Sequence, residues 1–352
     1  MKPRPKILFL YTEIAEYFLA CIRALHESAD IAIVRWPLNP EAPFQFEFHP
    51  DWQVLDRNNL NEKSLLDYSK AFAPDILVCS GWVDKAYNET AKYWHDKIPT
   101  VLSLDNHYTG SLRQLVGRMV SPFKLKNKFS HVWVPGEPQY IFARKLGYKP
   151  VQILKGFYSA DVTHFDTLFH QTFPQKKMRF PKRFIYMGRY LEFKGIFEMW
   201  DAFIEAVGDT NNKEWELWCL GTGDAWENRT EHPKIKHFGF VQPDDLQEIL
   251  QDAGVFVLPS RKEPWGVVVH EMAIAGFPMI CADKIGATTQ FLESDKNGLL
   301  FKAGDKEGLK SAFLQMMNTP ENQLIEMGEK SHEIGITHTP EIWKNTLLCL
   351  LR

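Results

Sequence analysis

The sequence lacks the cysteine pattern of a disulfide-stabilised or zinc-binding protein. Its five cysteines are scattered, odd in number and free of metal-ligand spacing; they are Cys21, Cys79, Cys219, Cys281 and Cys349. This usage argues against a disulfide framework and against a zinc site, and it suits a reducing cytoplasm. Long hydrophobic runs are also missing, because no apolar stretch approaches the ~20 residues that a membrane-spanning helix needs.

The N-terminus lacks the apolar length of a signal peptide. Basic residues precede an apolar run, but that run, 7–11, has only five residues, and Glu13 and Glu16 follow at once. The pattern predicts a first buried strand and no targeting segment. The chain also lacks a strong charge of either sign, since its formal net charge is -3 over 352 residues. This value argues against a general nucleic-acid binder.

What the sequence does contain is a regular alternation of short apolar runs and helical patterns. Buried strands are predicted over 6–11, 31–36, 75–80, 100–105, 131–136, 183–188, 216–221, 235–241, 255–260, 278–283 and 299–301. Helices are predicted over 16–29, 85–94, 197–207, 244–251, 265–276 and 340–350. Apolar strands separated by helices are typical of parallel sheets that are covered on both faces. Two such series predict an α/β fold with two doubly wound, Rossmann-like domains that face each other across a cleft.

The predicted domain boundaries follow from these two series. The first domain covers 1–160 and the second covers 183–335. The polar, aromatic stretch 161–182 has no clear period and is interpreted as the linker. The last segment, 336–352, contains a helix that packs on either domain, the first being preferred.

The stretch "PSRKEPWGVVVHEMAIAGFPMICAD" places two glutamates, Glu263 and Glu271, eight positions apart. Pro264 and Gly266 keep Glu263 in a loop, and the helix begins near 265–267, so Glu271 lies about one turn inside it. Backbone N–H groups at a helix start attract phosphate, and carboxylates accept hydrogen bonds from hydroxyl pairs. A nucleotide sugar offers both kinds of group.

Three further segments occur in the same order as in a known family. They are "FIYMGRYLEFKG" (184–195), "LWCLGTGD" (217–224) and "IKHFGFVQPDDLQEILQDAGVFVLPS" (235–260). Together with the paired glutamates they resemble the E-x7-E pattern of retaining glycosyltransferases with the GT-B fold, specifically family 4, also called glycosyl transferases group 1. The resemblance covers about 184–305, whereas the first half resembles the family only in layout. Gly221-x-Gly223 has no third glycine, so it is weak as a dinucleotide fingerprint.

The resemblance implies roles for residues of the second domain. Arg189 and Lys194 would hold the donor diphosphate, and their charges suit a leaving group of this kind. Glu263 would approach the donor sugar, and Glu271 would receive the ribose hydroxyls. The implied donor site also includes Gly221, Gly223, Phe240, Val241, Trp265, Gly266, Val267 and Val268. The reaction would retain the anomeric configuration by same-face attack and would need no cofactor and no bound metal.

The first domain would hold the acceptor. The chain has Thr12-Glu13-Ile14-Ala15 after its first strand, where many relatives carry a glycine-rich turn. Asp105, Asn106 and His107 follow the strand at 100–105; Asp105 and His107 are catalytic candidates and Asn106 an acceptor-binding one, but their order of importance stays open. Trp82 and Asp84 follow another strand and are further candidates for acceptor binding.

One stretch lacks acidic residues altogether, namely the residues between Asp105 and Glu137. Its basic residues alternate with apolar ones; they are Arg113, Arg118, Lys124, Lys126 and Lys128. A basic amphipathic segment over 113–128 suggests docking on an anionic membrane surface that carries a lipid-linked acceptor. The alternative is an ordinary helix with one solvated and one buried face.

The resemblance therefore predicts a transferase that moves a sugar from a nucleotide sugar, with a UDP-sugar favoured and GDP-mannose second, to a glycan, lipid-linked or small-molecule acceptor. The expected location is the cytoplasm or the inner face of its membrane. Alternatives are a nucleotide-sugar epimerase or phosphorylase of the same fold, a non-catalytic two-lobed sugar-binding protein, and a Rossmann oxidoreductase. The missing third glycine weakens the last of these.

Overall fold

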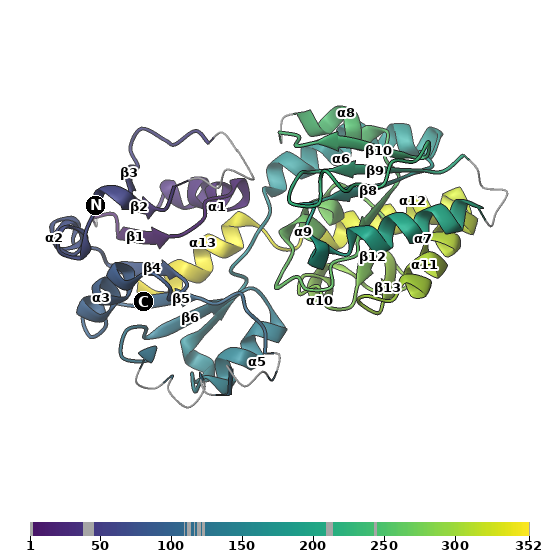
Figure 1. Ribbon diagram of the computed structural model, residues 1–352. Helices are drawn as coiled ribbons and strands as arrows, with labels where there is room; N and C mark the ends of the chain where they lie inside the picture. Colours follow the sequence, from purple (N-terminus) through teal and green to yellow (C-terminus); the bar gives the residue numbers. More distant parts are fainter. Residues whose placement is uncertain are drawn as a thin grey trace. The chain divides into compact units, whose positions relative to one another are not determined.

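The computed structural model describes residues 3–37, 46–108, 110, 114–115, 117, 121, 124–208, 214–242 and 245–351. The chain divides into two units, one formed by 1–160 together with 338–352 and the other by 161–337. Each unit is built around its own parallel sheet (Figure 1).

The first unit contains a seven-stranded parallel sheet with the order β3-β2-β1-β4-β5-β6-β7. Its strands are β1 (Lys6–Tyr11), β2 (Asp30–Arg35), β3 (Gln53–Asp56), β4 (Ile76–Ser80), β5 (Thr100–Ser103), β6 (His131–Val134) and β7 (Ile153–Lys155). Its helices are α1 (Glu16–His26), α2 (Glu62–Phe72), α3 (Lys85–Trp94), α5 (Glu137–Lys145) and α13 (Pro340–Leu348). Alternate residues of the central strands enter two apolar clusters, so both sheet faces are covered.

The second unit contains a six-stranded sheet with the order β10-β9-β8-β11-β12-β13. Its strands are β8 (Arg183–Met187), β9 (Glu216–Leu220), β10 (Ile235–Gly239), β11 (Val255–Leu258), β12 (Met279–Ala282) and β13 (Gly298–Phe301). Its helices are α6 (Val162–Met178), α7 (Ile196–Gly208), α8 (Leu246–Gln251), α9 (Val267–Ile274), α10 (Thr288–Phe291), α11 (Lys306–Asn318) and α12 (Glu321–Gly335). Helix α7 packs beside α11, whereas α6 packs beside α8, α9 and α12 (Figure 1).

The order of strands in the second unit decides where a ligand can bind. The chain enters the sheet at β8 and grows first toward β10, then returns to β11 on the other side of β8. Such a reversal between β8 and β11 leaves a crevice at the carboxyl ends of these two strands. The loops that follow β8 and β11 carry Arg189, Lys194 and Glu263.

The expected linker over 161–182 is instead largely helical. Helix α6 occupies most of it and belongs to the second unit. A helical apolar period is present in Phe165, Leu168 and Phe173, all buried. Polar Lys176 on the same buried side and Pro174 inside the helix obscure that period in the sequence.

The C-terminal helix α13 packs on the first unit, which settles the alternative that the sequence left open. Trp343 is 1% exposed, and its ring lies 4.7 Å from that of Trp133. The Trp343 indole N–H donates to the Phe157 carbonyl at 2.7 Å. In Figure 1 this helix, in yellow, lies among the purple and blue elements of the first unit.

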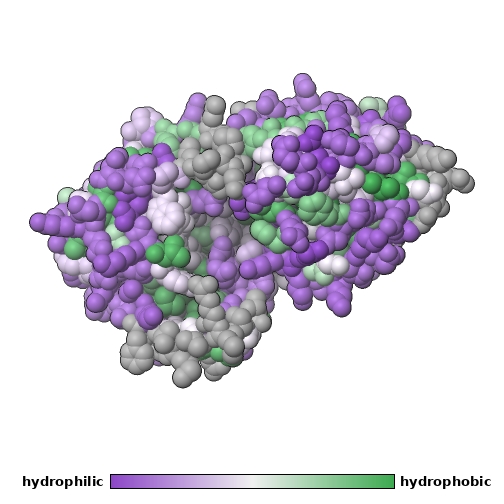
Figure 2. Space-filling model, viewed as in Figure 1, coloured by the Kyte–Doolittle hydropathy of each residue, from purple (hydrophilic) through white to green (hydrophobic). Residues whose placement is uncertain are grey.

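The face of the molecule shown in Figure 2 is mainly polar. On this face (Figure 2), hydrophilic side chains dominate and apolar ones form small separate patches. Within the part of the chain that the structure describes, no helix has both the length and the apolar character that crossing a bilayer requires.

Candidate functional site

The loops after β8 and β9 lie against each other through their backbones. A Cβ atom at Gly221 would lie 2.0 Å from the Gly188 carbonyl oxygen, and one at Gly223 would lie 2.8 Å from the Tyr190 carbonyl oxygen. Gly221 also has a positive φ of 128°. Only glycine fits such a close approach with this backbone conformation. The two glycines therefore serve to fix the loop that carries Arg189.

Lys194 and Glu263 form an ion pair in the second unit, although 69 positions separate them. Lys194 ends a short turn of 3-10 helix after β8, and Glu263 lies in the loop after β11. Each side chain is only 14% exposed. A pair of charges this far from water interacts strongly, and removing one partner leaves the other uncompensated. The structure thus joins a cation predicted to bind diphosphate to the carboxylate predicted to face the sugar.

Gly266 lets the chain pass from Glu263 directly into helix α9. Its φ is +87°, and a Cβ atom there would lie 2.9 Å from the Cγ atom of Glu263. Helix α9 begins at Val267, so the N–H groups of Val267 and Val268 have no earlier turn to bond to. Both residues are half-buried. The helix start therefore presents backbone donors beside the Lys194–Glu263 pair.

Glu271 is the fifth residue of α9 and is half-buried. Burial, and next the negative charge of Asp161, raise the pKa of its carboxyl to about 7. Sequence reasoning missed Asp161, whose side chain accepts the His164 N–H at the start of α6. Its position as a helix N-cap is the signal that could have identified it.

The remaining residues predicted for the donor lie around the same edge of the sheet. Arg189 has an exposed side chain, and its carbonyl accepts the Tyr186 hydroxyl at 2.9 Å. Trp265 is buried, and its carbonyl accepts the Ala287 N–H at 2.9 Å. Phe240 and Val241 follow β10 and are half-buried.

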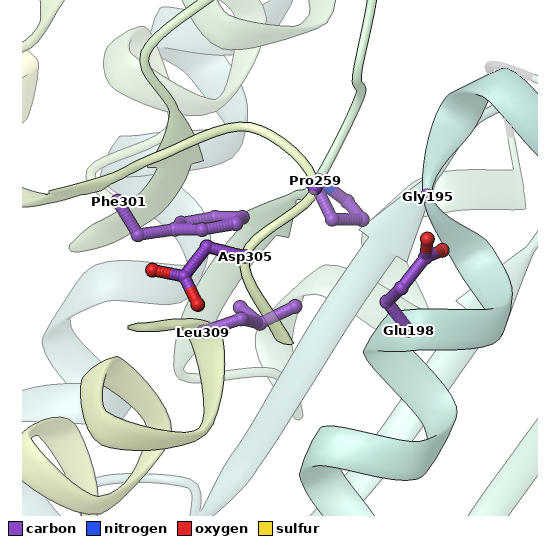
Figure 3. Close-up of a pocket in the computed structure, with 7 residues that line it drawn as sticks. Gly195, Glu198, Pro259, Phe301, Asp305 and Leu309 are labelled. Atoms are coloured by element: carbon purple, nitrogen blue, oxygen red, sulfur yellow. The ribbon is translucent and has the colours of Figure 1, made fainter. Parts of the chain in front are cut away.

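A shallow pocket opens near the end of β11 (Figure 3). It is lined by Gly195, Glu198, Pro259, Phe301, Gly304, Asp305 and Leu309. Glu198 pairs with Arg261 through one carboxylate oxygen, and no described residue bonds to the other, buried oxygen. The Asp305 carboxylate accepts the Gly308 N–H at the start of α11. Two carboxylates disfavour a phosphate, so we do not assign the donor diphosphate to this pocket.

In the first unit, Asp84 has a clear structural role. Its carboxylate caps α3 and accepts bonds from Arg57 at 2.8 Å and from the Trp36 indole at 3.0 Å. Burial alone would raise the pKa of the Asp84 carboxyl, but these hydrogen bonds lower it on balance. Its predicted acceptor role therefore has no support from its contacts. Trp82 lies in the loop before it and is 37% exposed.

Asp105 follows β5, and its carboxylate contacts neighbouring side chains. Its carboxylate accepts a bond from the Asn106 amide at 3.2 Å and one from the Tyr158 hydroxyl at 3.4 Å. The His107 carbonyl accepts the Gln114 side-chain amide at 2.9 Å. Burial is the main cause that raises the pKa of Tyr158, and the Asp105 charge adds to it. Tyr158 was not predicted from the sequence, because it lies 53 positions from Asp105.

Of the basic stretch 113–128, Arg113 and Arg118 lie outside the described residues. Lys124 is exposed, and Lys126 donates to the Gly147 carbonyl at 3.1 Å. Leu125 and Phe129 belong to the core of the first unit. The apolar side of residues 124–129 is therefore already covered by this protein.

Two groups of described residues place three potential metal ligands within 4.8 Å of one another. One group is His26, His49 and Asp51, and the other is Asp166, His170 and His332. None of these six residues is among those predicted for the donor.

Comparison with known proteins agrees with the resemblance seen in the sequence. Residues 181–319 match the family model for glycosyl transferases group 1. The lipopolysaccharide core biosynthesis glycosyltransferase LpsE of Rhizobium meliloti is 29% identical over 155 residues, which is 42% of each chain. The putative teichuronic acid biosynthesis glycosyltransferase TuaC of Bacillus subtilis is 32% identical over 129 residues, 37% of this chain and 31% of that protein. The chain thus spans less than half the length of these relatives.

Solved structures extend the similarity of fold to the whole chain. Sucrose-phosphate synthase from Thermosynechococcus elongatus has a TM-score of 0.73 at 15% identity, with 99% of both chains covered. Anabaena HepE in complex with UDP-glucose has a TM-score of 0.71 at 14% identity, with 98% of both chains covered. The two doubly wound units are those of a GT-B protein, as the sequence predicts. The match to the glycosyl transferases group 1 family model lies within its second unit.

Proposed function

We propose that the protein is a glycosyltransferase that moves a sugar from a nucleotide sugar to a glycan, lipid-linked or small-molecule acceptor. The observation that carries this proposal is the Lys194–Glu263 ion pair beside the start of α9, with Glu271 on the same helix. The cation and the backbone donors suit a diphosphate, and the two carboxylates suit the hydroxyls of a sugar and a ribose. All of these groups occur in one nucleotide sugar. A UDP-sugar is the first candidate donor and GDP-mannose the second. The Anabaena HepE structure with UDP-glucose supports this order.

The proposed mechanism stabilises the leaving diphosphate with protein groups. Arg189, Lys194 and the first N–H groups of α9 take up the negative charge that develops as the glycosidic bond breaks. The donor site then needs no bound metal. Glu263, held by Lys194 in the absence of ligand, contacts the sugar when the lysine turns to phosphate. The acceptor attacks from the face that the diphosphate leaves, and the anomeric configuration is retained.

A panel of nucleotide sugars tests the donor. The protein is incubated with each one, and slow release of nucleotide diphosphate is measured, first without an acceptor and then with candidate glycans. We expect release from a UDP-sugar, unchanged by a chelator. NMR of the product gives the anomeric configuration. Reversible change of the sugar without net diphosphate release would instead identify an epimerase, and binding without turnover would identify a sugar-binding protein.

Arg189→Ala tests the cationic loop directly. Losing one charge-assisted hydrogen bond costs roughly 1.5–3 kcal/mol, so the Kd for UDP should rise at least about tenfold. The exposed side chain contributes little packing, and the Tm should stay nearly unchanged. Calorimetry that finds an unaltered UDP affinity would falsify the assignment of Arg189 to the diphosphate.

A further inference from the structure

Two helices of the second unit bring a carboxylate and two imidazoles together away from the donor loops. Asp166 and His170 are one turn apart on α6, and His332 projects from α12. The Asp166 Oδ1 atom lies 3.5 Å from His170 Nε2 and 3.4 Å from His332 Nε2. All three potential ligand atoms lie within 4.8 Å of one another.

The hydrogen bond of the other ring nitrogen determines what His332 can offer. His332 Nδ1 lies 2.6 Å from the Ile274 carbonyl oxygen. A carbonyl oxygen only accepts hydrogen bonds, so Nδ1 carries the hydrogen. In the neutral ring, Nε2 then has a lone pair and no hydrogen. This lone pair faces the Asp166 carboxylate, which is also only an acceptor when ionised. Two facing acceptors need a cation or a proton between them.

The ring of His332 is also held in place. It stacks on the Phe169 ring, with 3.6 Å between centroids and 6° between planes. A histidine whose Nδ1–H is bonded to a backbone carbonyl and whose Nε2 is free has the arrangement common among metal-binding histidines. His332 is therefore oriented before any ion arrives.

The spacing of the atoms suits a small divalent ion. Ligand bonds of roughly 2.1 Å in a tetrahedral site put neighbouring ligand atoms roughly 3.4 Å apart. The two distances from Asp166, 3.4 and 3.5 Å, are close to this value. The His170 side chain is 68% exposed, so it can rotate to complete the site.

We propose that Asp166, His170 and His332 bind one divalent transition-metal ion, with Zn²⁺ as the first candidate and water as the fourth ligand. Two imidazoles and a carboxylate are a ligand set that zinc accepts. The ion joins α6 to α12 and, through the Ile274 carbonyl, to the end of α9. It is a structural ion, distinct from the donor site, and its presence does not depend on the proposed transferase activity.

The other cluster, in the first unit, is a natural control because its hydrogen bonds are already satisfied. The Trp52 indole N–H donates to His26 Nδ1 at 3.1 Å, and the Asp51 N–H donates to His49 Nδ1 at 3.2 Å. In each neutral ring the hydrogen is then on Nε2. His26 Nε2 faces the Asp51 carboxylate at 3.8 Å as a donor faces an acceptor. This cluster holds together without an ion.

Zinc binding to the whole protein tests the proposal. A tag-free sample is stripped with a chelator and titrated with Zn²⁺ near neutral pH by calorimetry, and the Tm is measured with and without Zn²⁺. We expect one tight equivalent and a higher Tm with metal, since an ion that binds only the folded state stabilises it. His170→Ala and Asp166→Asn should each weaken Zn²⁺ binding by at least about tenfold.

The variants separate the possible results. His170 is exposed and its side chain contacts few groups, so His170→Ala should fold normally without metal. His49→Ala, the matched change in the other cluster, should leave the tight equivalent intact. Co²⁺ in place of Zn²⁺ should give a visible spectrum typical of low coordination in the wild type and in His49→Ala, and should not do so in His170→Ala or Asp166→Asn. Absence of a tight equivalent, its survival in both His170→Ala and Asp166→Asn, or its loss in His49→Ala would each overturn the proposal.

Discussion

At the scale of single residues, the two glutamates of the opening motif differ in their surroundings. Glu263 is paired with Lys194, whereas the Glu271 carboxyl has a pKa raised to about 7 by burial and by Asp161. A raised carboxyl pKa means that the folded protein binds a proton more tightly than the unfolded chain. The contribution of this carboxyl to the free energy of unfolding is greatest below its ordinary pKa and is lost as pH rises toward 7. Hydrogen bonds from ligand hydroxyls favour the ionised carboxylate, so ligand binding would release this proton.

The pH dependence of UDP binding therefore tests Glu271. With a pKa of about 7, the carboxyl is about one-tenth ionised at about pH 6 and about nine-tenths at about pH 8, so UDP should bind about tenfold more weakly at the lower pH. Glu271→Gln should bind UDP weakly at both pH values and lose this part of the dependence, while protonation of the UDP phosphate acts equally on both proteins. The same pH profile in wild type and variant, measured by calorimetry, would exclude Glu271 from ribose binding.

Glu263 should behave differently under the matched substitution. Glu263→Gln keeps the side-chain volume next to Gly266 and frees Lys194 from its ion pair. We expect UDP affinity to be kept or improved, because the lysine becomes available to phosphate, and turnover to fall. If Glu263→Gln and Glu271→Gln lose UDP affinity to the same extent, the two roles are not divided in this way.

Lys176 is buried, and its Nζ atom lies 3.4 Å from the centroid of the Phe277 ring. Burial lowers the pKa of its amine well below the ordinary value of 10.5. The unfolded chain then binds the proton more tightly, so stability is reduced at neutral pH and recovers as pH rises toward the ordinary lysine pKa.

Lys176→Met should therefore raise the free energy of unfolding at pH 7 by roughly 1–3 kcal/mol. The difference from the wild type should shrink at about pH 9, where less free energy is needed to remove the proton. Lys177→Met changes the exposed neighbour, which pairs with Glu329, and should have a small effect. Thermal unfolding at both pH values measures this; a destabilised Lys176→Met protein would show that the amine is bonded in solution.

At the scale of elements, the sequence predicts the strands that contain an apolar run, including the edge strands β10 and β13, and misses two short edge strands of the first sheet. The apolar runs of β1, β4 and β11 are buried on both faces, and these strands are confirmed. The edge strands β3 and β7 have few buried residues and were not predicted, because an edge strand needs no continuous apolar run. Helix α6 was missed for the same kind of reason, since Pro174 and Lys176 interrupt its period.

The candidate site shows the same division between local and tertiary information. The sequence predicted which residues precede and begin α9, since Pro264, Gly266 and Gly276 mark that helix locally. It did not predict the Lys194–Glu263 pair, because that contact arises only when β8 and β11 become neighbours in the sheet. The tautomer of His332 likewise depends on a carbonyl 58 positions away.

The close approach of the β8 and β9 loops gives a prediction at this scale. Gly221→Ala adds a Cβ atom that would lie 2.0 Å from the Gly188 carbonyl oxygen, so the loop that carries Arg189 must move. Gly147→Ala has a similar positive φ but open space around the new atom, and it isolates the conformational cost of about 1–2 kcal/mol. Gly221→Ala should be less stable than Gly147→Ala and should also lose UDP affinity. Equal effects of the two changes, by thermal unfolding and calorimetry, would remove the loop contact from the donor site.

At the scale of the whole molecule, the basic stretch 113–128 is the segment that we expect to dock on a membrane. The described residues of this stretch restrict the kind of contact that it can make with lipid. Leu125 is 8% exposed and Phe129 is fully buried, and both pack in the core of the first unit. These side chains are not free to insert among lipid tails. Attraction by residues 124–128 would therefore be electrostatic, and salt would weaken it.

Co-sedimentation with liposomes tests this form of docking. The protein should sediment with vesicles of anionic lipid at low salt and be released at high salt, whereas neutral vesicles should not retain it. Each basic residue near such a surface contributes about 1 kcal/mol, so changing Lys124, Lys126 and Lys128 to glutamine should remove roughly 3 kcal/mol and detach most of the protein. A variant with Lys236, Lys284 and Lys302 of the second unit changed to glutamine loses the same charge and should still bind.

Since the donor residues lie in the other unit, the variant changed at Lys124, Lys126 and Lys128 should hydrolyse donor as before, yet turn over a lipid-linked acceptor more slowly. Equal release of both variants would mean that net charge alone causes binding, and no binding of the wild type at low salt would leave residues 124–129 as an ordinary amphipathic segment with one buried face.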